Sequence, residues 1–546
     1  MKIKTLQLDI KGMTCDHCAT SIEKKLDADG IIEKSVSYKE AGGQISFDEN
    51  KISSEDITNL VNGLGHYKVT GSSELQENFG NENHLIIIGG GSAAFAATIQ
   101  ARKHGAKVTM INGGLPIGGT CVNVGCVPSK NLIRAAEAMH KANHNPFSGV
   151  ESSGRLTSFK DLIKQKSDLV LDLRQQKYIN VIKDMENFRK IEGRAKITSP
   201  TTVEVNGKTI SGSHILLATG ARPLIPNIPG LNDVPFLTNE EAFELEELPK
   251  SVIVLGGRYI ALEIAQMFSR LGSKVTILQR SDRILPTETA DLTDELTGYF
   301  EEEGITVVAG NNLVSVNKKD GQISVESLIN GETRHFEAEK MIVATGRQAN
   351  TSNMGLQEIG VELNSSGFVK VNDNLQTSVS TIYSAGDVLG ENMFVYTAAY
   401  EGKLAANNMF NPVQKERDYT ALPWVVFTDP QVAGVGLDEN QAAEKGIEAD
   451  TAVLLLSHVP RAIAAKDTRG FIKLIRDKNT DKLIGARILA PEGSELLMEV
   501  AMVIKFGITT EQIIEMFHPY LILGEGIKLA AITFSKSVEE LSCCAT

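Results

Sequence analysis

The stretch Gly118-Gly-Thr-Cys-Val-Asn-Val-Gly-Cys-Val-Pro-Ser-Lys130 holds two cysteines, Cys121 and Cys126, in a glycine-rich turn. Two thiols this close together can form a small disulfide or offer two soft sulfur ligands to a metal. The run at residues 131–138 predicts a helix that begins near Asn123, and a helix N-terminus favours a thiolate over a thiol. The stretch therefore indicates a redox or soft-metal dithiol, with a pair of buried structural cysteines as the alternative.

A dinucleotide-binding pattern precedes this turn. The run His84-Leu-Ile-Ile-Ile88 predicts a buried strand, and Gly89-x-Gly91-x-x-Ala94 opens an alanine-rich helix. Gly89 permits the tight turn, Gly91 lets the backbone approach a pyrophosphate, and Ala94 allows close packing of helix on strand. A strand at residues 107–111 completes the first half of such a unit. We therefore predict a bound dinucleotide next to the dithiol.

The length and charge of the whole chain narrow its class. A chain of 546 residues is too long for one core and predicts three or four domains. A formal net charge of −13 argues against a nucleic-acid partner, and no apolar run is long enough to span a membrane. The N-terminus lacks the features of a signal peptide. We expect a soluble protein in a reducing cytoplasm, where free cysteines persist.

The cysteines occur only as close pairs. These pairs are Cys15 with Cys18, Cys121 with Cys126, and Cys543 with Cys544. Neighbouring cysteines such as the last two can bridge each other only with strain. Three pairs in a cytoplasmic chain therefore indicate three dithiol ligand sets.

Residues 1–72 have their own pattern of apolar positions, which predicts the element order βαββαβ. Its apolar positions are Leu6, Leu8, Ile10, Ala19, Ile22, Leu26, Val36, Tyr38, Ile45, Phe47, Ile57, Leu60, Val61 and Leu64. Ser53 or Ser54 is expected to cap the second helix. This order is the split βαβ arrangement. The polar residues 73–83 that follow predict a flexible linker.

The motif Gly12-Met-Thr-Cys-x-x-Cys18, together with this element order, resembles the heavy-metal-associated domain of copper chaperones and metal-pumping ATPases. Cys15 and Cys18 suit linear coordination of a soft cation such as Cu(I) or Hg(II), whereas zinc prefers four ligands. His17 lies between the two cysteines. We expect it to be an exposed loop residue, with a role as third ligand as the alternative.

A second strand-turn-helix unit covers residues 251–263, and a strand at residues 274–278 completes it. Arg258 stands where the second motif glycine would be. After the second strand, where an acidic residue would bind the ribose of NAD, the chain has Gln279 followed by Arg280 and Arg283. Two cations without a carboxylate favour the 2′-phosphate of NADPH. A solvated surface pair of arginines is the alternative.

The chain also repeats a buried strand with a sharp turn. Residues 215–223 contain Thr219 and Gly220, residues 341–347 contain Gly346, and the similarity indicates an internal duplication. A later turn places the carboxylate of Asp387 where a sugar-alcohol chain can bind. Beyond about residue 418, alternating strands and two helices indicate a separate α+β domain.

Together, these motifs resemble the pyridine nucleotide-disulfide oxidoreductases over residues 84–546. The resemblance implies NADPH on the second unit, a C-terminal dimerisation domain, and FAD on the first unit at Gly89, Gly91, Gly119, Thr120 and Asp387. Asn112 departs from the family, which usually has an acidic residue there for the FAD ribose.

The resemblance also implies roles for individual side chains. Cys126 would lie against the flavin and Cys121 would exchange with substrate. Lys130 and Glu263 resemble the buried ion pair of the family near flavin N5, and Tyr259 resembles the ring that gates the nicotinamide pocket.

The C-terminus departs from most of the class. Tyr520 stands where the family has a proton-shuttling histidine, whereas Glu525 is kept. We expect His518 to be a helix-end or core histidine. The tyrosine, the Cys543-Cys544 tail and the heavy-metal-associated domain jointly resemble the mercuric reductases over the entire chain.

That resemblance implies a cytoplasmic homodimer that reduces Hg(II), supplied as thiol complexes, to Hg(0). Hydride would pass from NADPH to FAD, and two electrons would then reach Hg(II) held by Cys121 and Cys126. Cys543 and Cys544 of the partner subunit would deliver the ion. The alternatives are a thiol-disulfide reductase acting on lipoamide, glutathione or coenzyme A disulfides, and a metal-binding chaperone.

The expected fold combines a ferredoxin-like domain, two Rossmann-like domains and an α+β dimerisation domain. The expected boundaries are 1–72 for the heavy-metal-associated domain, 73–83 for the linker, 84–240 and 351–417 for the FAD domain, 241–350 for the NADPH domain, and 418–546 for the dimerisation domain with its tail. The expected cofactor-binding residues are Gly89, Gly91, Ala94, Gly119, Thr120, Lys130, Thr219, Gly220, Asp387, Gly256, Arg280, Arg283 and Gly346.

Overall fold

The computed structural model describes residues 3–75 and 83–540. The chain divides into two compact units, of which one contains the N-terminal residues up to His84 and the other contains almost all the rest. Each unit has its own buried apolar core. Among the described residues, no helix combines the length and the apolar character needed to cross a bilayer.

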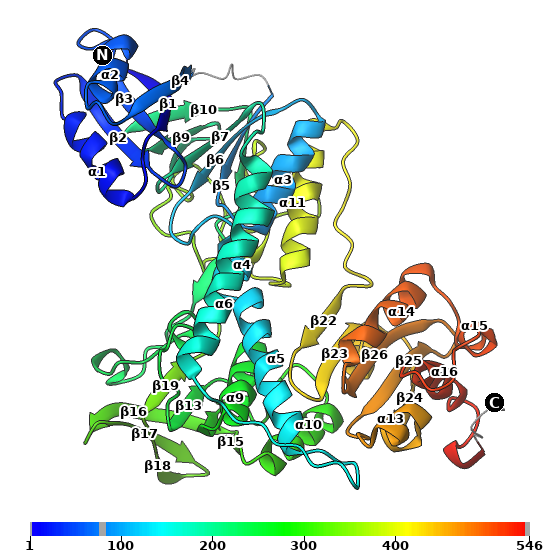
Figure 1. Ribbon diagram of the computed structural model, residues 1–546. Coiled ribbons are helices and arrows are strands. Elements are labelled where there is room, and N and C mark those ends of the chain that lie inside the picture. The colour runs from blue at the N-terminus through cyan, green and yellow to red at the C-terminus, as the bar shows by residue number, and fades with distance from the viewer. Residues whose placement is uncertain (1–2, 76–82, 541–546) are drawn as a thin grey trace. The chain divides into compact units, whose positions relative to one another are not determined.

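The N-terminal unit has the predicted βαββαβ order (Figure 1). Its elements are β1 (Ile3–Lys11), α1 (Asp16–Lys25), β2 (Ile31–Ser37), β3 (Gly42–Asp48), α2 (Ser54–Asn62) and β4 (Lys68–Leu75). The antiparallel sheet has the strand order β2-β3-β1-β4, and both helices bury their apolar faces in one core. Ser53 caps α2 and forms a capping box with Asp56. Strand β4 continues into the segment that the sequence predicted as linker.

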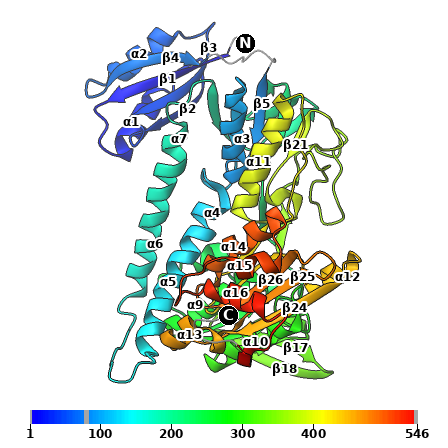
Figure 2. The same ribbon diagram turned by 90° about the vertical axis from the view of Figure 1, so that its right-hand side faces the viewer.

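The first Rossmann-like domain is built on a parallel sheet with the strand order β21-β11-β5-β6-β7. Its elements are β5 (His84–Ile88), α3 (Ser92–Lys103), β6 (Lys107–Asn112), β7 (Phe188–Glu192), β11 (His214–Leu217), β21 (Ile382–Ser384) and α11 (Val395–Phe410). Helices α3 and α11 lie side by side although they are far apart in sequence (Figures 1 and 2). Gly402 allows this close approach because it has no side chain. An added Cβ there would lie 2.1 Å from the carbonyl oxygen of Ala93.

The second Rossmann-like domain has a parallel sheet with the order β15-β14-β13-β19, beside an antiparallel sheet β16-β17-β18. Its elements are β13 (Ser251–Leu255), α9 (Tyr259–Leu271), β14 (Lys274–Leu278), α10 (Ala290–Glu302), β15 (Thr306–Val308), β16 (Asn311–Lys319), β17 (Gln322–Ile329), β18 (Glu332–Ala338) and β19 (Lys340–Val343). Strand β13, inside the parallel sheet, and its neighbour β19 are buried along almost their whole length, as expected for parallel sheets.

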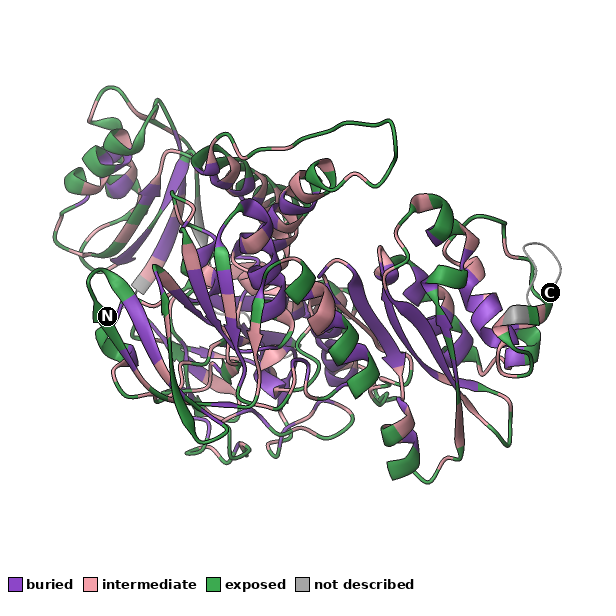
Figure 3. Cartoon of the chain, turned by 90° about the horizontal axis from the view of Figure 1, so that it is seen from below, coloured by how far each residue is buried: buried purple, intermediate pink, exposed green. Residues whose placement is uncertain are grey.

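The C-terminal domain is an antiparallel sheet with the order β22-β23-β26-β25-β24. Its elements are β22 (Pro423–Val426), β23 (Gln431–Gly436), α12 (Glu439–Glu444), β24 (Ala449–Leu455), α13 (Pro460–Ala465), β25 (Phe471–Asp477), β26 (Leu483–Ala490), α14 (Gly493–Phe506), α15 (Thr510–Glu515) and α16 (Glu525–Ile532). Figure 3 shows the buried centre of the sheet between more exposed helices. These domains confirm the predicted fold class.

One helical prediction is wrong at its C-terminal end. The charged stretch at residues 158–189, whose apolar residues mix helical spacings, predicts a helix throughout, but the helix ends at Ile182 and Phe188–Glu192 is the edge strand β7. The helical part consists of α6 (Phe159–Arg174), a π-helical turn (Gln175–Ile179) and α7 (Asn180–Ile182). The wider π turn shifts the apolar face of the helix, which explains why the apolar residues mix helical spacings.

Further helices and strands lie between the elements named above along the chain. They are α4 (Gly119–Asn123), α5 (Cys126–Asn143), β8 (Lys196–Ser199), β9 (Thr202–Val205), β10 (Lys208–Ser211), β12 (Ala221–Pro223), α8 (Asn239–Ala242) and β20 (Arg347–Ala349).

The separate core of the N-terminal unit predicts separate unfolding. Phe47 is fully buried in that core, so Phe47→Ala should lower the free energy of unfolding of this unit by about 3–5 kcal/mol. Calorimetry of the full chain should show one transition moving to lower temperature while the other stays. Ile32→Ala, at a 48% exposed position of the same unit, is the matched control. A common shift of all transitions would contradict the division into two units.

Candidate functional site

The two cysteines of the glycine-rich turn lie on two successive helices. Cys121 lies in the short helix α4, and Cys126 is the first residue of α5, preceded by Gly125. The long helix therefore begins three residues later than the sequence predicted. The reason is that Val124 and Gly125 have non-helical backbone angles, which end α4 and start a new helix. Both cysteines are free thiols and partly exposed.

The two thiols share their proton unequally. The Cys121 thiol donates a hydrogen bond to Cys126, which lowers the pKa of Cys126 to about 7 with help from the Lys130 ammonium and against the effect of burial. The same hydrogen bond and burial raise the pKa of Cys121. At neutral pH the pair therefore holds a large fraction of one thiolate, on Cys126, beside one thiol.

An ion pair with a buried carboxylate fixes the cation beside Cys126. The Nζ of Lys130, one helical turn after Cys126, lies 2.7 Å from an oxygen of Glu263 on α9. The other Glu263 oxygen accepts a hydrogen bond of 3.0 Å from the backbone N–H of Phe427, and Lys130 Nζ lies 4.5 Å from the centre of the Phe427 ring. The dithiol helix is thereby joined to α9 and to the segment after β22.

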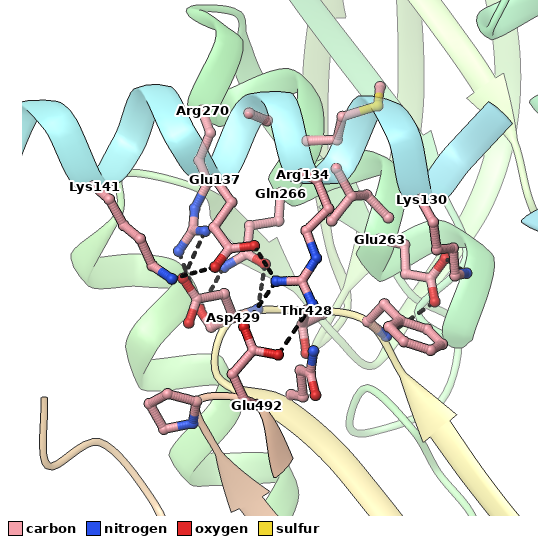
Figure 4. A pocket seen from close by; sticks show the side chains of 16 residues that line it. Lys130, Arg134, Glu137, Lys141, Glu263, Gln266, Arg270, Thr428, Asp429 and Glu492 are labelled. Atoms are coloured by element: carbon pink, nitrogen blue, oxygen red, sulfur yellow. Dashed lines mark hydrogen bonds and ion pairs between the residues drawn. The ribbon is translucent and has the colours of Figure 1, made fainter. Parts of the chain in front are cut away.

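A second set of ion pairs extends this connection along α5 (Figure 4). Arg134 contacts Glu137 at 2.7 Å and Glu492 at 2.8 Å, and Arg270 on α9 contacts Asp429 at 2.8 Å. These side chains surround a cavity of about 30 Å³, which is the space of one or two water molecules. The set holds α5 against the C-terminal domain and leaves no room for a substrate.

The glycines of the first Rossmann-like domain form a cradle. Gly89 has φ +130°, and an added Cβ would lie 2.1 Å from the carbonyl oxygen of Ala218. Gly119, from the dithiol segment, faces Gly91 so closely that a Cβ on Gly119 would lie 2.8 Å from the Gly91 Cα. Ala94 is fully buried, as close helix packing requires. The backbone at the start of α3 is therefore open to a pyrophosphate.

Two polar side chains, Thr219 and Asp387, point to a cofactor at the same cradle. The hydroxyl of Thr219, before the left-handed Gly220, is buried and has no hydrogen-bond partner. Burial raises the pKa of Asp387, with the cation of Arg347 opposing that rise. Buried polar groups normally have partners. Together with the partly exposed Thr120, these residues fit FAD.

The second Rossmann-like domain has a similar turn with a different residue in it. Gly256 has φ +117°, and an added Cβ would lie 2.4 Å from the carbonyl oxygen of Ala344. Arg258 has an ordinary φ of −108° and is exposed, so this position does not require glycine. Gln279 is 7% exposed and packs against Gly257.

The two predicted phosphate-binding arginines remain accessible. Arg280 is exposed, Arg283 is partly exposed, and Gly346, with φ +151°, is exposed in the turn after β19. The second Rossmann-like domain therefore presents two arginine side chains to solvent just after the end of β14.

Tyr259 lies in a row of aromatic rings. Its ring stacks on Phe394 at 6.0 Å and on Trp424 at 5.7 Å, and Tyr396 stacks on Phe394 at 5.3 Å. Burial raises the pKa of Tyr259, so its phenol stays protonated. The sequence identified only Tyr259, because the other rings come from distant segments and have no shared spacing.

Tyr178 is a further residue that sequence reasoning missed. It lies in the π-helical turn, and its ring meets Phe95 of α3 edge-on at 4.9 Å. Burial raises the pKa of Tyr178, and both Cys121 and Cys126 contribute to the rise. The irregular apolar spacing of this segment was the available signal, since π turns are frequent at functional sites.

The C-terminal candidates lie around α16. Tyr520 is 49% exposed, and Glu525 begins α16 with one carboxylate oxygen 3.4 Å from the backbone nitrogen of Leu521. The side chain of His518 is mostly covered and lies 2.7 Å from Glu499, which agrees with the expected structural role. Cys543 and Cys544 lie outside the described residues.

The loop before α1 of the N-terminal unit brings two sulfurs together. Cys15 is the N-cap of α1, and its sulfur lies 3.7 Å from that of Cys18. Hydrogen bonds from the Thr14 backbone and from the Tyr67 side chain lower the pKa of Cys18 to about 6. His17 is exposed, as expected. Across residues 3–75 and 83–540, no group of three or more His, Cys, Asp or Glu side chains forms a metal site.

Comparison with known proteins assigns the parts of the chain. Residues 83–402 match the pyridine nucleotide-disulphide oxidoreductase family, residues 422–531 match the dimerisation domain of that family, and residues 7–66 match the heavy-metal-associated domain. The mercuric reductase of Staphylococcus aureus is 39% identical over 550 residues, with 100% of both chains covered. The mercuric reductase of Lysinibacillus sphaericus is 40% identical, with 99% of each chain covered.

Solved structures agree with this assignment. The Cu(II) complex of the HOCl-induced flavoprotein disulfide reductase RclA from Escherichia coli has a TM-score of 0.74 at 28% identity and covers 84% of this chain and 100% of its own. LpdA from Mycobacterium tuberculosis has a TM-score of 0.75 at 26% identity and covers 83% of this chain and 100% of its own. The chain thus belongs to the pyridine nucleotide-disulphide oxidoreductase family, as a mercuric reductase-like member with an N-terminal heavy-metal-associated domain.

Proposed function

We propose that this protein uses NADPH and FAD to reduce Hg(II) to Hg(0). The observation that carries the proposal is the unequal dithiol, in which Cys126 is about half ionised at neutral pH and Cys121 is a thiol, next to the glycine cradle. A soft divalent ion prefers two thiolate sulfurs, and this pair supplies them with the release of one proton. The similarity to mercuric reductases over the full chain supports the same substrate.

The dithiol takes Hg(II) from thiol complexes by exchange. The Cys126 thiolate attacks the metal and displaces one incoming thiolate, which accepts the proton that Cys121 releases. Cys121 then displaces the second thiolate, so that one thiol and one thiolate leave and the ion is held by two protein sulfurs. Lys130 favours the anionic sulfur throughout, because Glu263 keeps the ammonium in place.

Electron transfer requires the cofactors. Bound FAD would supply two-electron redox chemistry, so that NADPH and Hg(II) would give NADP⁺, a proton and Hg(0). FAD would be held by the glycine cradle, by the partly exposed Thr120, and by the polar side chains of Asp387 and of Thr219, whose hydroxyl is buried and has no protein partner. These residues are Gly89, Gly91, Gly119, Thr120, Thr219, Gly220 and Asp387.

NADPH would bind on the second Rossmann-like domain. Arg280 and Arg283 would contact its 2′-phosphate, and the buried Gln279 offers no carboxylate that would repel this phosphate. Tyr259 would cover the nicotinamide site as part of the aromatic row. These residues support a preference for NADPH over NADH.

The C-terminal domain would form a homodimer through an apolar face. Met498, Met502 and Phe506 recur every four residues on α14 and are 59%, 57% and 72% exposed, and Phe517 nearby is fully exposed. Apolar side chains gathered on one helix face mark an association surface. In the dimer, Tyr520 and the Cys543-Cys544 tail of one subunit would serve the dithiol of the partner.

The paired sulfurs of the N-terminal unit would bind Hg(II) and pass it on. The sulfurs of Cys15 and Cys18 are close enough for one linear ion, and the lowered pKa of Cys18 supplies a thiolate at neutral pH. A thiol-disulfide reductase is less consistent with the structure, because Tyr520 cannot replace the histidine proton shuttle of that class and His518 is bound to Glu499.

The first test is a direct assay. The purified protein should be yellow, and its consumption of NADPH should rise when HgCl₂ is added with excess thiol, measured at 340 nm. NADH should give a lower kcat/KM. Brisk reduction of organic disulfides without any response to Hg(II) would overturn the proposal.

The unequal dithiol predicts a pH dependence. A lowered thiol pKa keeps Cys126 anionic above about pH 7, so alkylation of reduced protein should rise from pH 6 to pH 8 with a midpoint near 7. Cys121→Ala removes the hydrogen bond that contributes most, and the midpoint should move towards the ordinary thiol value of 9.0. Mass spectrometry of the Cys126 peptide gives the rate at each pH. An unchanged midpoint in Cys121→Ala would refute the shared proton.

The proposed role of the C-terminal tail is to deliver Hg(II) to Cys121 and Cys126, so its loss should affect that delivery alone. Replacing both Cys543 and Cys544 by Ala should slow turnover with thiol-chelated Hg(II), because the dithiol must then extract the ion without an intermediate ligand pair. Reduction of the bound flavin by NADPH in stopped flow should stay normal. Ser542→Ala is the matched control. Full mercury turnover in the double variant would remove the tail from the mechanism.

A further inference from the structure

The carboxyl ends of β6 and β7 bring an amide and a carboxylate together. These parallel strands pair in a register that places Asn112 opposite Glu192 at the last position of each. The amide nitrogen of Asn112 donates a hydrogen bond of 3.1 Å to one carboxylate oxygen of Glu192. In folds of this class, the carboxyl edge of the sheet is where a dinucleotide binds.

This pair adjoins the glycine cradle. The backbone N–H of Gly89 donates a hydrogen bond of 2.8 Å to the carbonyl of Ile111, so the first turn of the cradle and the end of β6 are direct neighbours. An acidic residue at the end of β6 would normally accept hydrogen bonds from the hydroxyls of the adenosine ribose. Asn112 occupies that position without the charge.

Both N–H groups of the Asn112 side chain already donate hydrogen bonds within the protein. Its side chain is 6% exposed, and the amide nitrogen donates to the carbonyl of Leu115 at 3.1 Å as well as to Glu192. Its oxygen faces Gly90, where an added Cβ would lie only 2.3 Å away. Since an amide has two N–H groups, both are used within the protein. The role of Asn112 is to hold the neighbouring carboxylate.

Glu192 has the capacity that Asn112 lacks. Its side chain is 59% exposed, with one oxygen bound to Asn112 and the other 3.2 Å from Lys190. A carboxylate can accept about four hydrogen bonds, so sites for two hydroxyls remain. Its backbone is fixed, because the Asn206 amide donates to the Glu192 carbonyl at 2.9 Å and Gly193 N–H donates to Asn112 at 2.8 Å.

We propose that Glu192, one strand further along the sheet, binds the 2′- and 3′-hydroxyls of the FAD adenosine ribose in place of a residue at the end of β6. The inference rests on the FAD binding proposed above. Asn112 acts as a positioning residue that orients the Glu192 carboxylate. The carboxylate thus reaches the ribose from a different strand than in relatives with an acidic residue at the end of β6.

The test measures cofactor affinity in the absence of turnover. Flavin-free full-length protein is titrated with FAD and with an FAD analogue whose adenosine lacks the 2′-hydroxyl, and flavin fluorescence gives both Kd values. The wild type should bind FAD about tenfold or more tightly than the analogue, as expected for a hydrogen bond to a charged group. In Glu192→Ala the Kd for FAD should rise by a similar factor, and the preference between the two flavins should disappear.

Glu204→Ala, which removes another exposed carboxylate from β9, is the matched control and should keep the preference. Because Glu192 is exposed, Glu192→Ala should keep the far-UV circular dichroism of the wild type. If Glu192→Ala binds FAD and still prefers it over the analogue by the wild-type factor, the inference is overturned. If the wild type binds no FAD at all, the proposed function fails instead.

Discussion

The arrangement of the site depends on one proton shared by two sulfurs. An ordinary thiol with a pKa of 9.0 is about 1% ionised at pH 7, whereas a pKa of about 7 leaves Cys126 roughly half ionised. The hydrogen bond from Cys121 contributes most of this shift, and burial opposes it. A pair of this kind has one sulfur ready to attack and a second that becomes a ligand when it loses its proton.

The surrounding fold holds this pair of cysteines and the Lys130 ammonium in place. Lys130 is one turn from Cys126 on α5, and Glu263 comes from α9 of the second Rossmann-like domain. The backbone N–H of Phe427 binds the same carboxylate, so the C-terminal domain contributes to the site within one subunit. Further ion pairs from Arg134 and Arg270 fasten the same helices. Glu263 and Arg270 are the buried members of these pairs, so removing the partner of either would leave an uncompensated buried charge.

Much of this was predictable from sequence because its causes are local. Glycines that require positive φ, the capping serine of α2 and the alternation in β1 are each determined by neighbouring residues, and these elements occur where they were predicted. The start of α5 was misplaced, since the break at Gly125 depends on unusual backbone angles. The predicted helix extended past its observed end at Ile182 into β7, because the charged residues there are compatible with both a helix and an edge strand.

The contacts that could not be predicted from the sequence are those between residues far apart in the chain. Phe394 and Trp424 join Tyr259 only in the folded chain, and Tyr178 reaches the dithiol region through a π turn. The sequence showed that Asn112 lacks a charge, but only the register of β6 with β7 revealed which carboxylate lies beside it.

The central claim is that the dithiol alone can hold the ion with two sulfurs. A variant with Ala at Cys15, Cys18, Cys543 and Cys544 retains only Cys121 and Cys126, and X-ray absorption at the mercury edge reports the ligands of one added equivalent of Hg(II). The account predicts two sulfur ligands in linear geometry. Oxygen or nitrogen ligands, a higher coordination number, or no bound mercury would contradict it.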